Sequence, residues 1–142
     1  MFGQAQAISD ICMFCRDLEV SIEFYRDKLN FKPRRRAEGF ADFETEGVIV
    51  ALWEMSHFAK HVGYADTDSK PPAHKAMTAI ALENCEVVDK IYNDLLAKGV
   101  VFINAPKAYP WNAYCAYFHD PDNNLWELYA RMGDPDDYHE SA

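Results

Sequence analysis

The chain has 142 residues, of which 49% are hydrophobic and 14% aromatic, and this suits one compact domain or two small modules that share a core. Its formal net charge of −9 opposes binding to nucleic-acid phosphates, and it contains no apolar run long enough to span a membrane. The N-terminal stretch MFGQAQAISD lacks the features of a secretory signal. We therefore expect a cytoplasmic protein that binds neither nucleic acid nor membranes.

Residues 8–15, ISDICMFC, alternate in the manner of a half-buried strand. Within them, Cys12 and Cys15 have the CxxC spacing that redox proteins and zinc sites use. Residues three apart on a strand point to opposite faces, and the sequence contains no second CxxC. We therefore expect all four cysteines to be reduced thiols, most of them buried.

A helix is predicted next, because Asp17 suits an N-cap and Leu18, Ile22, Tyr25 and Leu29 recur at helical spacing. The basic cluster at 34–36, RRR, follows it. We interpret this cluster as a solvated strand edge that charge keeps from pairing, and capture of an anion is the alternative.

Two strand-like segments, AEGFADFET and GVIVALWE, surround a turn at Glu46 and Gly47. Residues 56–76 read as a polar linker with one possible helical turn at its start. In it His57 and His61 are four apart, as zinc-binding pairs are, but Phe58 stands where the metalloprotease pattern has Glu. We expect these histidines to be solvated surface residues.

The second half repeats this order. Strand-like MTAIAL (77–82) precedes a helix that Asn84 can cap, whose apolar stripe is Val88, Tyr92, Leu95 and Leu96, and Gly99 can end it. The strand-like segments NAYCAYFH and NLWELYA follow, and NLWEL echoes ALWEM of the first half. The sequence therefore predicts a duplicated module.

Two motifs carry a family resemblance. ISDICMFCRDLEVSIEFYRDKLNFKP resembles the opening of the vicinal oxygen chelate superfamily (glyoxalase, bleomycin-resistance and extradiol-dioxygenase proteins), and YFHDPDNNLWELY resembles its closing turn and last strand. Where the superfamily commonly has Gly, this chain has Asn30 and Asn123, and Asn tolerates positive φ.

The resemblance covers roughly residues 6–131 and implies an α+β fold. In this fold, tandem βαβββ modules form a curved, cup-shaped mixed sheet around a central site, and members often form homodimers. The first module would be 1–68, the second 69–131, and 132–142 an acidic flexible tail, with one compact domain overall.

The resemblance also implies a metal position, since the superfamily's metal enzymes hold a divalent cation with four side chains, usually His and Glu. Carried over, the positions fall on Asp10, Met77, Glu127 and either Ala51 or Glu54, depending on strand register. The candidate ligands for nickel, manganese, zinc or iron are therefore Glu127, Asp10 and Glu54, and Glu127 is the candidate catalytic residue. Because a thioether suits such a site poorly and both imidazoles are missing, we expect no metal cofactor.

Strand alternation predicts that an apolar, aromatic cavity holds a small organic ligand, although the same aromatics could simply fill a core. The side chains expected to line it or close its rim, besides Glu127, are Asp10, Cys12, Phe14, Trp53, Met77, Ala79, Trp111, Tyr117 and Tyr129. The favoured function is metal-free binding of a small molecule, as in bleomycin-resistance-like members. The alternative is a divalent-metal-dependent glyoxalase-like lyase or isomerase, with an extradiol dioxygenase behind it.

Overall fold

The structure, a computed structural model, describes residues 8–62 and 76–133. The chain divides into two compact units, Met1–Pro71 and Pro72–Ala142. The module boundary expected after residue 68 lies outside the described residues, as does most of the expected acidic tail.

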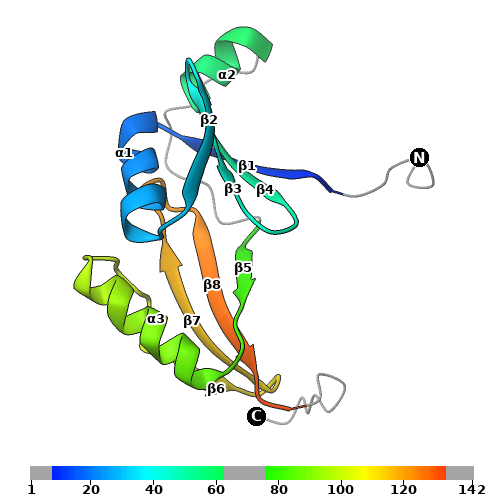
Figure 1. Cartoon of the computed structure of the whole chain (residues 1–142), viewed down its shortest axis with the longest axis vertical. Coiled ribbons are helices and arrows are strands. Elements are labelled where there is room, and N and C mark those ends of the chain that lie inside the picture. Colours follow the sequence, from blue (N-terminus) through cyan, green and yellow to red (C-terminus); the bar gives the residue numbers. More distant parts are fainter. Residues whose placement is uncertain (1–7, 63–75, 134–142) are drawn as a thin grey trace, which may run out of the picture. The chain divides into compact units, whose positions relative to one another are not determined.

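The first unit is a βαβββ module with one additional helix (Figure 1). Its strands form one sheet in the order β1-β4-β3-β2, in which β1 and β4 are parallel and the other neighbours are antiparallel. Its elements, in chain order, are β1 (Asp10–Cys15), α1 (Leu18–Glu23), the π-helical turn η1 (Phe24–Lys28), β2 (Lys32–Ala37), β3 (Phe40–Glu44), β4 (Ile49–Glu54) and α2 (Met55–Val62).

The second unit repeats the same topology, with the sheet order β5-β8-β7-β6 and parallel pairing of β5 with β8. This repetition confirms the predicted α+β class and the tandem βαβββ modules. The elements of this unit are β5 (Thr78–Ala81), α3 (Cys85–Ala97), β6 (Lys107–Tyr109), β7 (Ala113–His119) and β8 (Leu125–Arg131).

Both predicted helix caps are confirmed. The Asp17 carboxylate accepts hydrogen bonds from the N–H groups of Glu19 and Val20, at 3.0 and 3.2 Å. The side-chain oxygen of Asn84 accepts one from the N–H of Val87 at 3.0 Å. These bonds satisfy amide groups that have no partner within the first turn of a helix.

The predicted apolar stripes pack their helices onto the sheets. The buried stripe residues are Leu18, Ile22, Tyr25, Val88 and Leu95. Leu96 is exposed, because it lies one position past Leu95 and is therefore rotated about 100° away from the core line. Within each unit the core is strongly aromatic: Tyr25 and Phe43 are fully buried in the first, and Phe118 stacks on Trp126 in the second.

The predicted left-handed turns are also present. Asn30 and Asn123 have φ values of 58° and 67°, so asparagine does adopt the conformation for which the superfamily commonly uses glycine. Gly99 ends α3 with a φ of 83°, as expected, and Asn112 has a positive φ that the sequence did not indicate.

Three elements differ from the sequence prediction. The chain turns at Glu38 and Gly39, so the arginine cluster lies in the separate edge strand β2 and residues 37–45 are not one strand. Helix α2 has eight residues where a single turn was expected, and β6 has only three, too few for a periodic pattern. No helix of the described residues is both long and apolar enough to cross a membrane.

Candidate functional site

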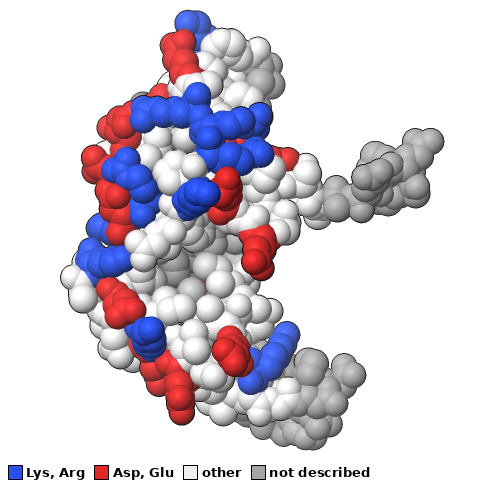
Figure 2. Space-filling model, viewed as in Figure 1, with Lys and Arg blue, Asp and Glu red and all other residues white. Residues whose placement is uncertain are grey.

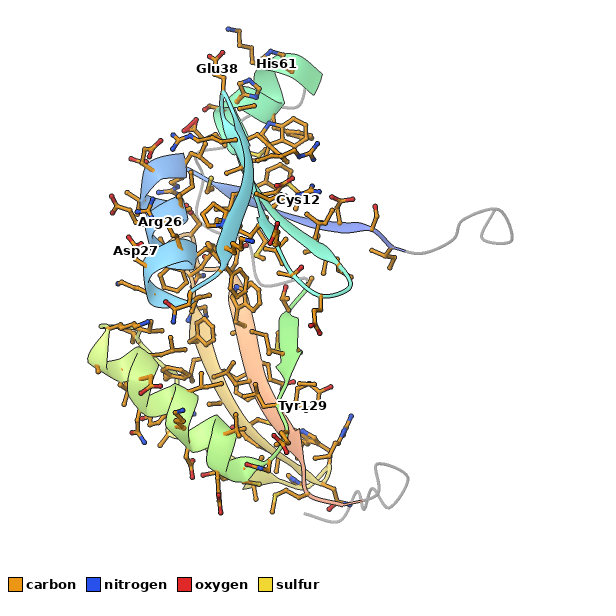
Figure 3. All side chains as sticks on the ribbon, viewed as in Figure 1. Cys12, Arg26, Asp27, Glu38, His61 and Tyr129 are labelled. Carbon is orange, nitrogen blue, oxygen red and sulfur yellow. The ribbon has the colours of Figure 1, made fainter. Side chains whose placement is uncertain are left out.

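Each sheet has one face that packs against the helix of its own module, and we call the opposite side the open face. On β8, Trp126, Leu128 and Ala130 are buried on the side of α3. The residues that alternate with them, among them Glu127 and Tyr129, point to the open face and are partly exposed. Figure 3 labels Tyr129 on β8.

Strand register gathers several predicted site residues on the open face of the second unit. Glu127 pairs with Ala79 of β5 and with Tyr117 of β7. Tyr129 pairs with Cys115, and the same alternation places Met77 on this face, just before β5. One carboxylate thus lies among aromatic, thiol and small side chains.

The groups beside Glu127 are neutral hydrogen-bond donors. Burial, together with a hydrogen bond to Glu127, raises the pKa of the Tyr117 hydroxyl well above its usual value. Burial also raises the pKa of the Cys115 thiol, and the nearby Glu127 charge adds to that rise. At neutral pH both groups therefore keep their protons and can orient the carboxylate, and Cys115 is not an activated nucleophile.

An aromatic cluster borders this carboxylate. Tyr109 stacks on Trp111, with ring centroids 4.6 Å apart and planes inclined by 23°. The edge of Tyr109 meets Tyr117, at 5.9 Å and 88°. Trp111 is 38% exposed, so part of the cluster is accessible. Sequence reasoning did not identify Tyr109 and Cys115, because β6 is short and the pairing of β6 with β7 cannot be seen in one sequence.

Two tyrosine rings of this face contact positively charged side chains of the protein itself. The Lys107 ammonium lies 5.0 Å from the centroid of Tyr109. The Arg131 guanidinium lies 5.4 Å from that of Tyr129. Both are cation–π contacts, in which the electron-rich ring face attracts a cation. The rings of the second open face are therefore electron-rich surfaces that attract cations.

The open face of the first unit carries the predicted residues of β1 and β4. Phe14 pairs with Trp53, and Cys12 pairs with Ala51. Cys12 (labelled in Figure 3) is exposed here. Cys15 points to the helix side and is buried, as expected for residues three apart on a strand. Phe58 of α2 contacts Phe14 and Trp53, with centroids 4.8 and 5.1 Å away.

The register also decides between Ala51 and Glu54. Ala51 lies on the open face, whereas Glu54 pairs with Cys15 and points to the helix side. There the Glu54 carboxylate accepts a hydrogen bond from the N–H of Leu18 at 3.3 Å, at the start of α1. Glu54 is therefore not placed to join Asp10 in a metal site.

The residues at the four inferred metal positions are thus Asp10, Ala51, Met77 and Glu127. They offer two carboxylates, from different units, with a methyl group and a thioether, and this set does not fit the His and Glu ligands of a divalent-metal enzyme. Among residues 8–62 and 76–133, no three His, Cys, Asp or Glu side chains are grouped as metal ligands would be.

The two histidines of α2 are held by other groups. The indole N–H of Trp53 donates to Nδ1 of His57 at 3.0 Å. Nδ1 of His61 lies 2.8 Å from the carbonyl oxygen of His57 and donates to it, because a carbonyl only accepts. The rings stack at 4.1 Å. Because Nδ1 of His57 accepts a hydrogen bond, its Nε2 carries the ring hydrogen and cannot bind zinc, so the two rings are not arranged around a shared zinc ion.

Sequence reasoning missed Asp42, which is fully buried on β3 although its side chain is charged. Its carboxylate accepts hydrogen bonds from Arg34 (Nε at 3.0 Å and Nη2 at 2.7 Å) and from Arg35 (Nε at 3.0 Å and the backbone N–H at 3.0 Å). The pattern FADFE, with an acid in the middle of an apolar strand, was the available signal, because a buried acid requires a cationic partner.

Comparisons with known proteins agree with this fold. Residues 7–128 match the family described as "Glyoxalase/Bleomycin resistance protein/Dioxygenase superfamily". The chain is 34% identical over 127 residues to "Uncharacterized protein YraH" of Bacillus subtilis, covering 86% of this chain and 96% of that protein. It is 29% identical over 119 residues to "Bleomycin resistance protein" of Geobacillus stearothermophilus, covering 82% and 90%. A crystal structure of a glyoxalase/bleomycin resistance protein/dioxygenase from Nocardioides is similar with a TM-score of 0.85 and 38% identity, covering 93% and 89%.

Proposed function

Since the chain belongs to the glyoxalase/bleomycin resistance protein/dioxygenase superfamily, we propose that it binds a small organic molecule through the open face of its second unit, without a metal centre. We further propose a cytoplasmic location and a homodimeric state.

The observation that carries the proposal is the position of Glu127 among aromatic rings. Tyr109, Trp111 and Tyr117 form a connected aromatic cluster beside a carboxylate that the Tyr117 hydroxyl orients. Small-molecule sites combine apolar, aromatic walls with a few placed polar groups. A carboxylate has several lone pairs, so Glu127 can accept a further hydrogen bond from a ligand.

The chemistry of this face favours a planar or cationic ligand. The cation–π contacts of Lys107 and Arg131 show that these rings attract positive charge, and a ligand cation could replace either side chain. The net charge of −9 favours the approach of such a ligand over long distances. The similarity to a protein named for bleomycin resistance supports sequestration as the role.

The binding test uses copper-free bleomycin as the probe, titrated by calorimetry into the purified full chain. We expect saturable binding, and we expect Glu127→Gln to weaken it about tenfold, as for loss of a charge-assisted hydrogen bond. Tyr117→Phe should also weaken it. The matched controls are Glu83→Gln, an exposed acid before α3, and Tyr114→Phe, on the same strand but on the helix side, and both should bind as the natural protein does.

The metal test incubates the protein with nickel, manganese, zinc and iron(II), followed by dialysis and elemental analysis. The proposal expects no stoichiometric uptake. Two results together would contradict the proposal and support the glyoxalase-like lyase instead. They are stoichiometric metal that is lost in Glu127→Gln and turnover of the methylglyoxal–glutathione adduct. Glu127 favours that alternative, since it stands at the acid position that the superfamily's metal enzymes use.

A further inference from the structure

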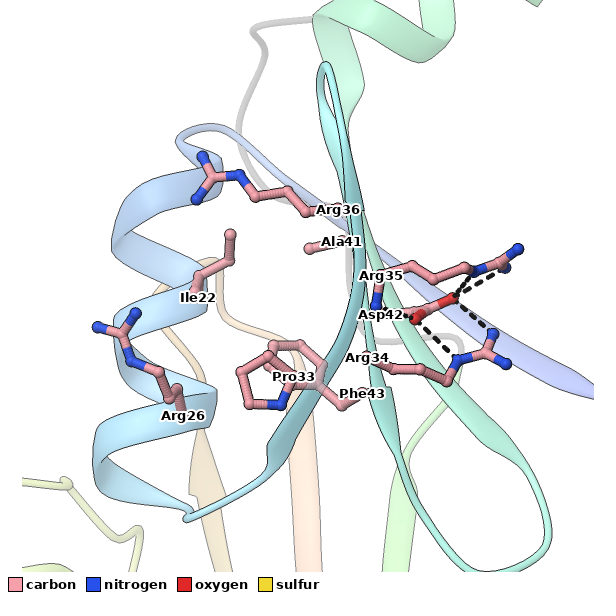
Figure 4. Close-up of a pocket in the computed structure, with 9 residues that line it drawn as sticks. All are labelled: Ile22, Arg26, Pro33, Arg34, Arg35, Arg36, Ala41, Asp42 and Phe43. Carbon is pink, nitrogen blue, oxygen red and sulfur yellow. Dashed lines mark hydrogen bonds and ion pairs between the residues drawn. The ribbon is translucent and has the colours of Figure 1, made fainter.

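Two consecutive arginines share one face of the first sheet. Neighbours on a strand normally point to opposite sides, but the pairing of β2 with β3 shifts register between Pro33 and Arg35. As a result, both Arg34 and Arg35 reach the Asp42 carboxylate (Figure 4). In the same view, Arg36 lies on the opposite side, toward α1.

Asp42 fixes the two guanidinium groups in place. Its Oδ2 atom lies 2.7 Å from Nη2 of Arg34 and 2.9 Å from Nη2 of Arg35, so the two cations meet at one oxygen. The Asp42 side chain is fully buried, whereas those of Arg34 and Arg35 are 33% and 65% exposed. One buried carboxylate therefore holds two solvent-accessible cations in a fixed geometry.

The cluster keeps hydrogen-bond donors and positive charge for a second anion. A guanidinium has five N–H donors, and in each arginine only the Nε and Nη2 groups bond to Asp42. The three charges sum to one positive charge. Two further acids act on Arg34 only through their fields, which solvent weakens. They are the exposed Asp10 and Glu44, and Glu44 is paired with Lys32 at 2.9 Å. Figure 2 shows the basic side chains gathered over β2.

A pocket of about 170 Å³ lies along β2. Arg34, Arg35 and Asp42 contribute to its lining, together with Arg26, Arg36 and the apolar residues Ile22, Pro33, Ala41 and Phe43. Arg26 forms an ion pair with Asp27, and Arg36 forms one with Glu19. Each of these cations thus has an acid to itself, unlike Arg34 and Arg35.

An aromatic row runs beside the arginine pair on the same open face. Phe14, Trp53 and Phe40 lie across three strands, and the ring centroids of Phe40 and Trp53 are 5.9 Å apart in an edge-to-face contact. The adjacent row contains Cys12, Ala51 and Asp42, so small side chains separate the aromatic rings from the cations. Phe14 is 40% exposed, although Phe58 of α2 contacts its ring.

We propose that Arg34 and Arg35 bind the carboxylate of a small aromatic acid whose ring packs toward the Phe14–Trp53–Phe40 row. The planar fork of arginine matches a carboxylate with two parallel hydrogen bonds, and two forks held side by side favour an anion over a neutral ligand of equal shape. The site lies wholly in the first unit and goes beyond the proposed function, which concerns the second.

The experiment uses 2-naphthoate as the probe and 2-naphthamide as its neutral counterpart, titrated by calorimetry into the full chain. We expect saturable naphthoate binding and much weaker naphthamide binding. Arg35→Gln should raise the naphthoate Kd about tenfold or more, and it should fold, since Arg34 still neutralises Asp42. Arg36→Gln, the adjacent arginine on the other side, is the matched control and should leave the Kd within about twofold.

Nuclear magnetic resonance provides a second readout. Naphthoate should shift the Nε–H signals of Arg34 and Arg35 and the indole N–H signal of Trp53. Glu127→Gln, which tests the second open face, should leave naphthoate binding unchanged. Absence of naphthoate binding, equal loss in Arg35→Gln and Arg36→Gln, or loss in Glu127→Gln would each overturn the proposal, and none of these results depends on whether bleomycin binds.

Discussion

At the scale of single residues, the buried carboxylate of Asp42 is the side chain with the largest consequences. Hydrogen bonds from Arg34 and Arg35 lower its pKa to about 2, although burial alone would raise it. A buried charge that loses its partners is strongly destabilising, so Asp42 and its arginines act as one unit. Here stability and the proposed anion site depend on the same three groups.

This unit predicts an acid-dependent loss of stability. The pKa of Asp42 is about 2 in the folded chain and roughly 3.9 when unfolded, so its ionised form stabilises the fold fully above about pH 4. That contribution, roughly 2 kcal/mol, is lost as the pH falls toward 2. Urea unfolding of the natural protein and of Asp42→Asn should show a stability difference that shrinks between pH 6 and 3. A difference independent of pH would contradict this assignment.

At the scale of secondary-structure elements, the hairpin between β2 and β3 depends on a close approach to α2. Gly39 has a φ of +69°, and a Cβ added there would lie 2.5 Å from Cγ of His57. The Trp53–His57 hydrogen bond holds that ring in position. The turn, the histidine and the start of α2 are thus packed as one corner of the first unit.

This corner predicts different results for two glycine substitutions. Gly39→Ala should combine the strain of positive φ with a steric clash and cost about 3 kcal/mol of unfolding free energy. Gly47 has a φ of +86°, but a Cβ added there would have no atom within 4 Å. Gly47→Ala should therefore lower the unfolding free energy by only about 1 kcal/mol. Denaturant unfolding of both variants measures the difference. Equal costs would show that His57 does not restrict the turn.

Features with local causes were predictable from the sequence. Short motifs indicated the helix caps, because the side chains of Asp17 and Asn84 bond to backbone N–H groups nearby in the sequence. A short motif also indicated the turn at Asn123, because asparagine itself tolerates positive φ. Placing Glu127 on the last strand came from the resemblance. The pattern FADFE could indicate a buried acid with a cationic partner. It could not indicate that Arg34 and Arg35 both reach Asp42, because this requires a register shift between two strands that no single-sequence pattern reveals.

At the scale of the whole molecule, two units of the same topology each present an open face with accessible apolar side chains. Phe14 is 40% exposed in the first unit, and Met77 and Trp111 are 44% and 38% exposed in the second. Monomeric proteins seldom leave large apolar patches in water, so these faces are suited to contact a ligand or another protein surface. This is the physical basis for expecting a homodimer.

Sedimentation velocity tests this expectation directly. Each chain has a mass of 16.3 kDa, and we expect a single species of twice that mass at micromolar concentrations. A charge introduced into an apolar contact surface should weaken the dimer, because the charge must lose its water on association. Trp111→Glu should therefore shift the distribution toward the monomer. A monomeric natural protein across the whole concentration range would rule the dimer out.

The sharing of Asp42 by two arginines has a consequence for how this protein can evolve. Because one arginine is enough to neutralise the acid, the other can be substituted while the chain still folds. Ligand preference can therefore change by one substitution at a time, with a folded protein at each stage. An acid paired with a single arginine would require both residues to be replaced at once.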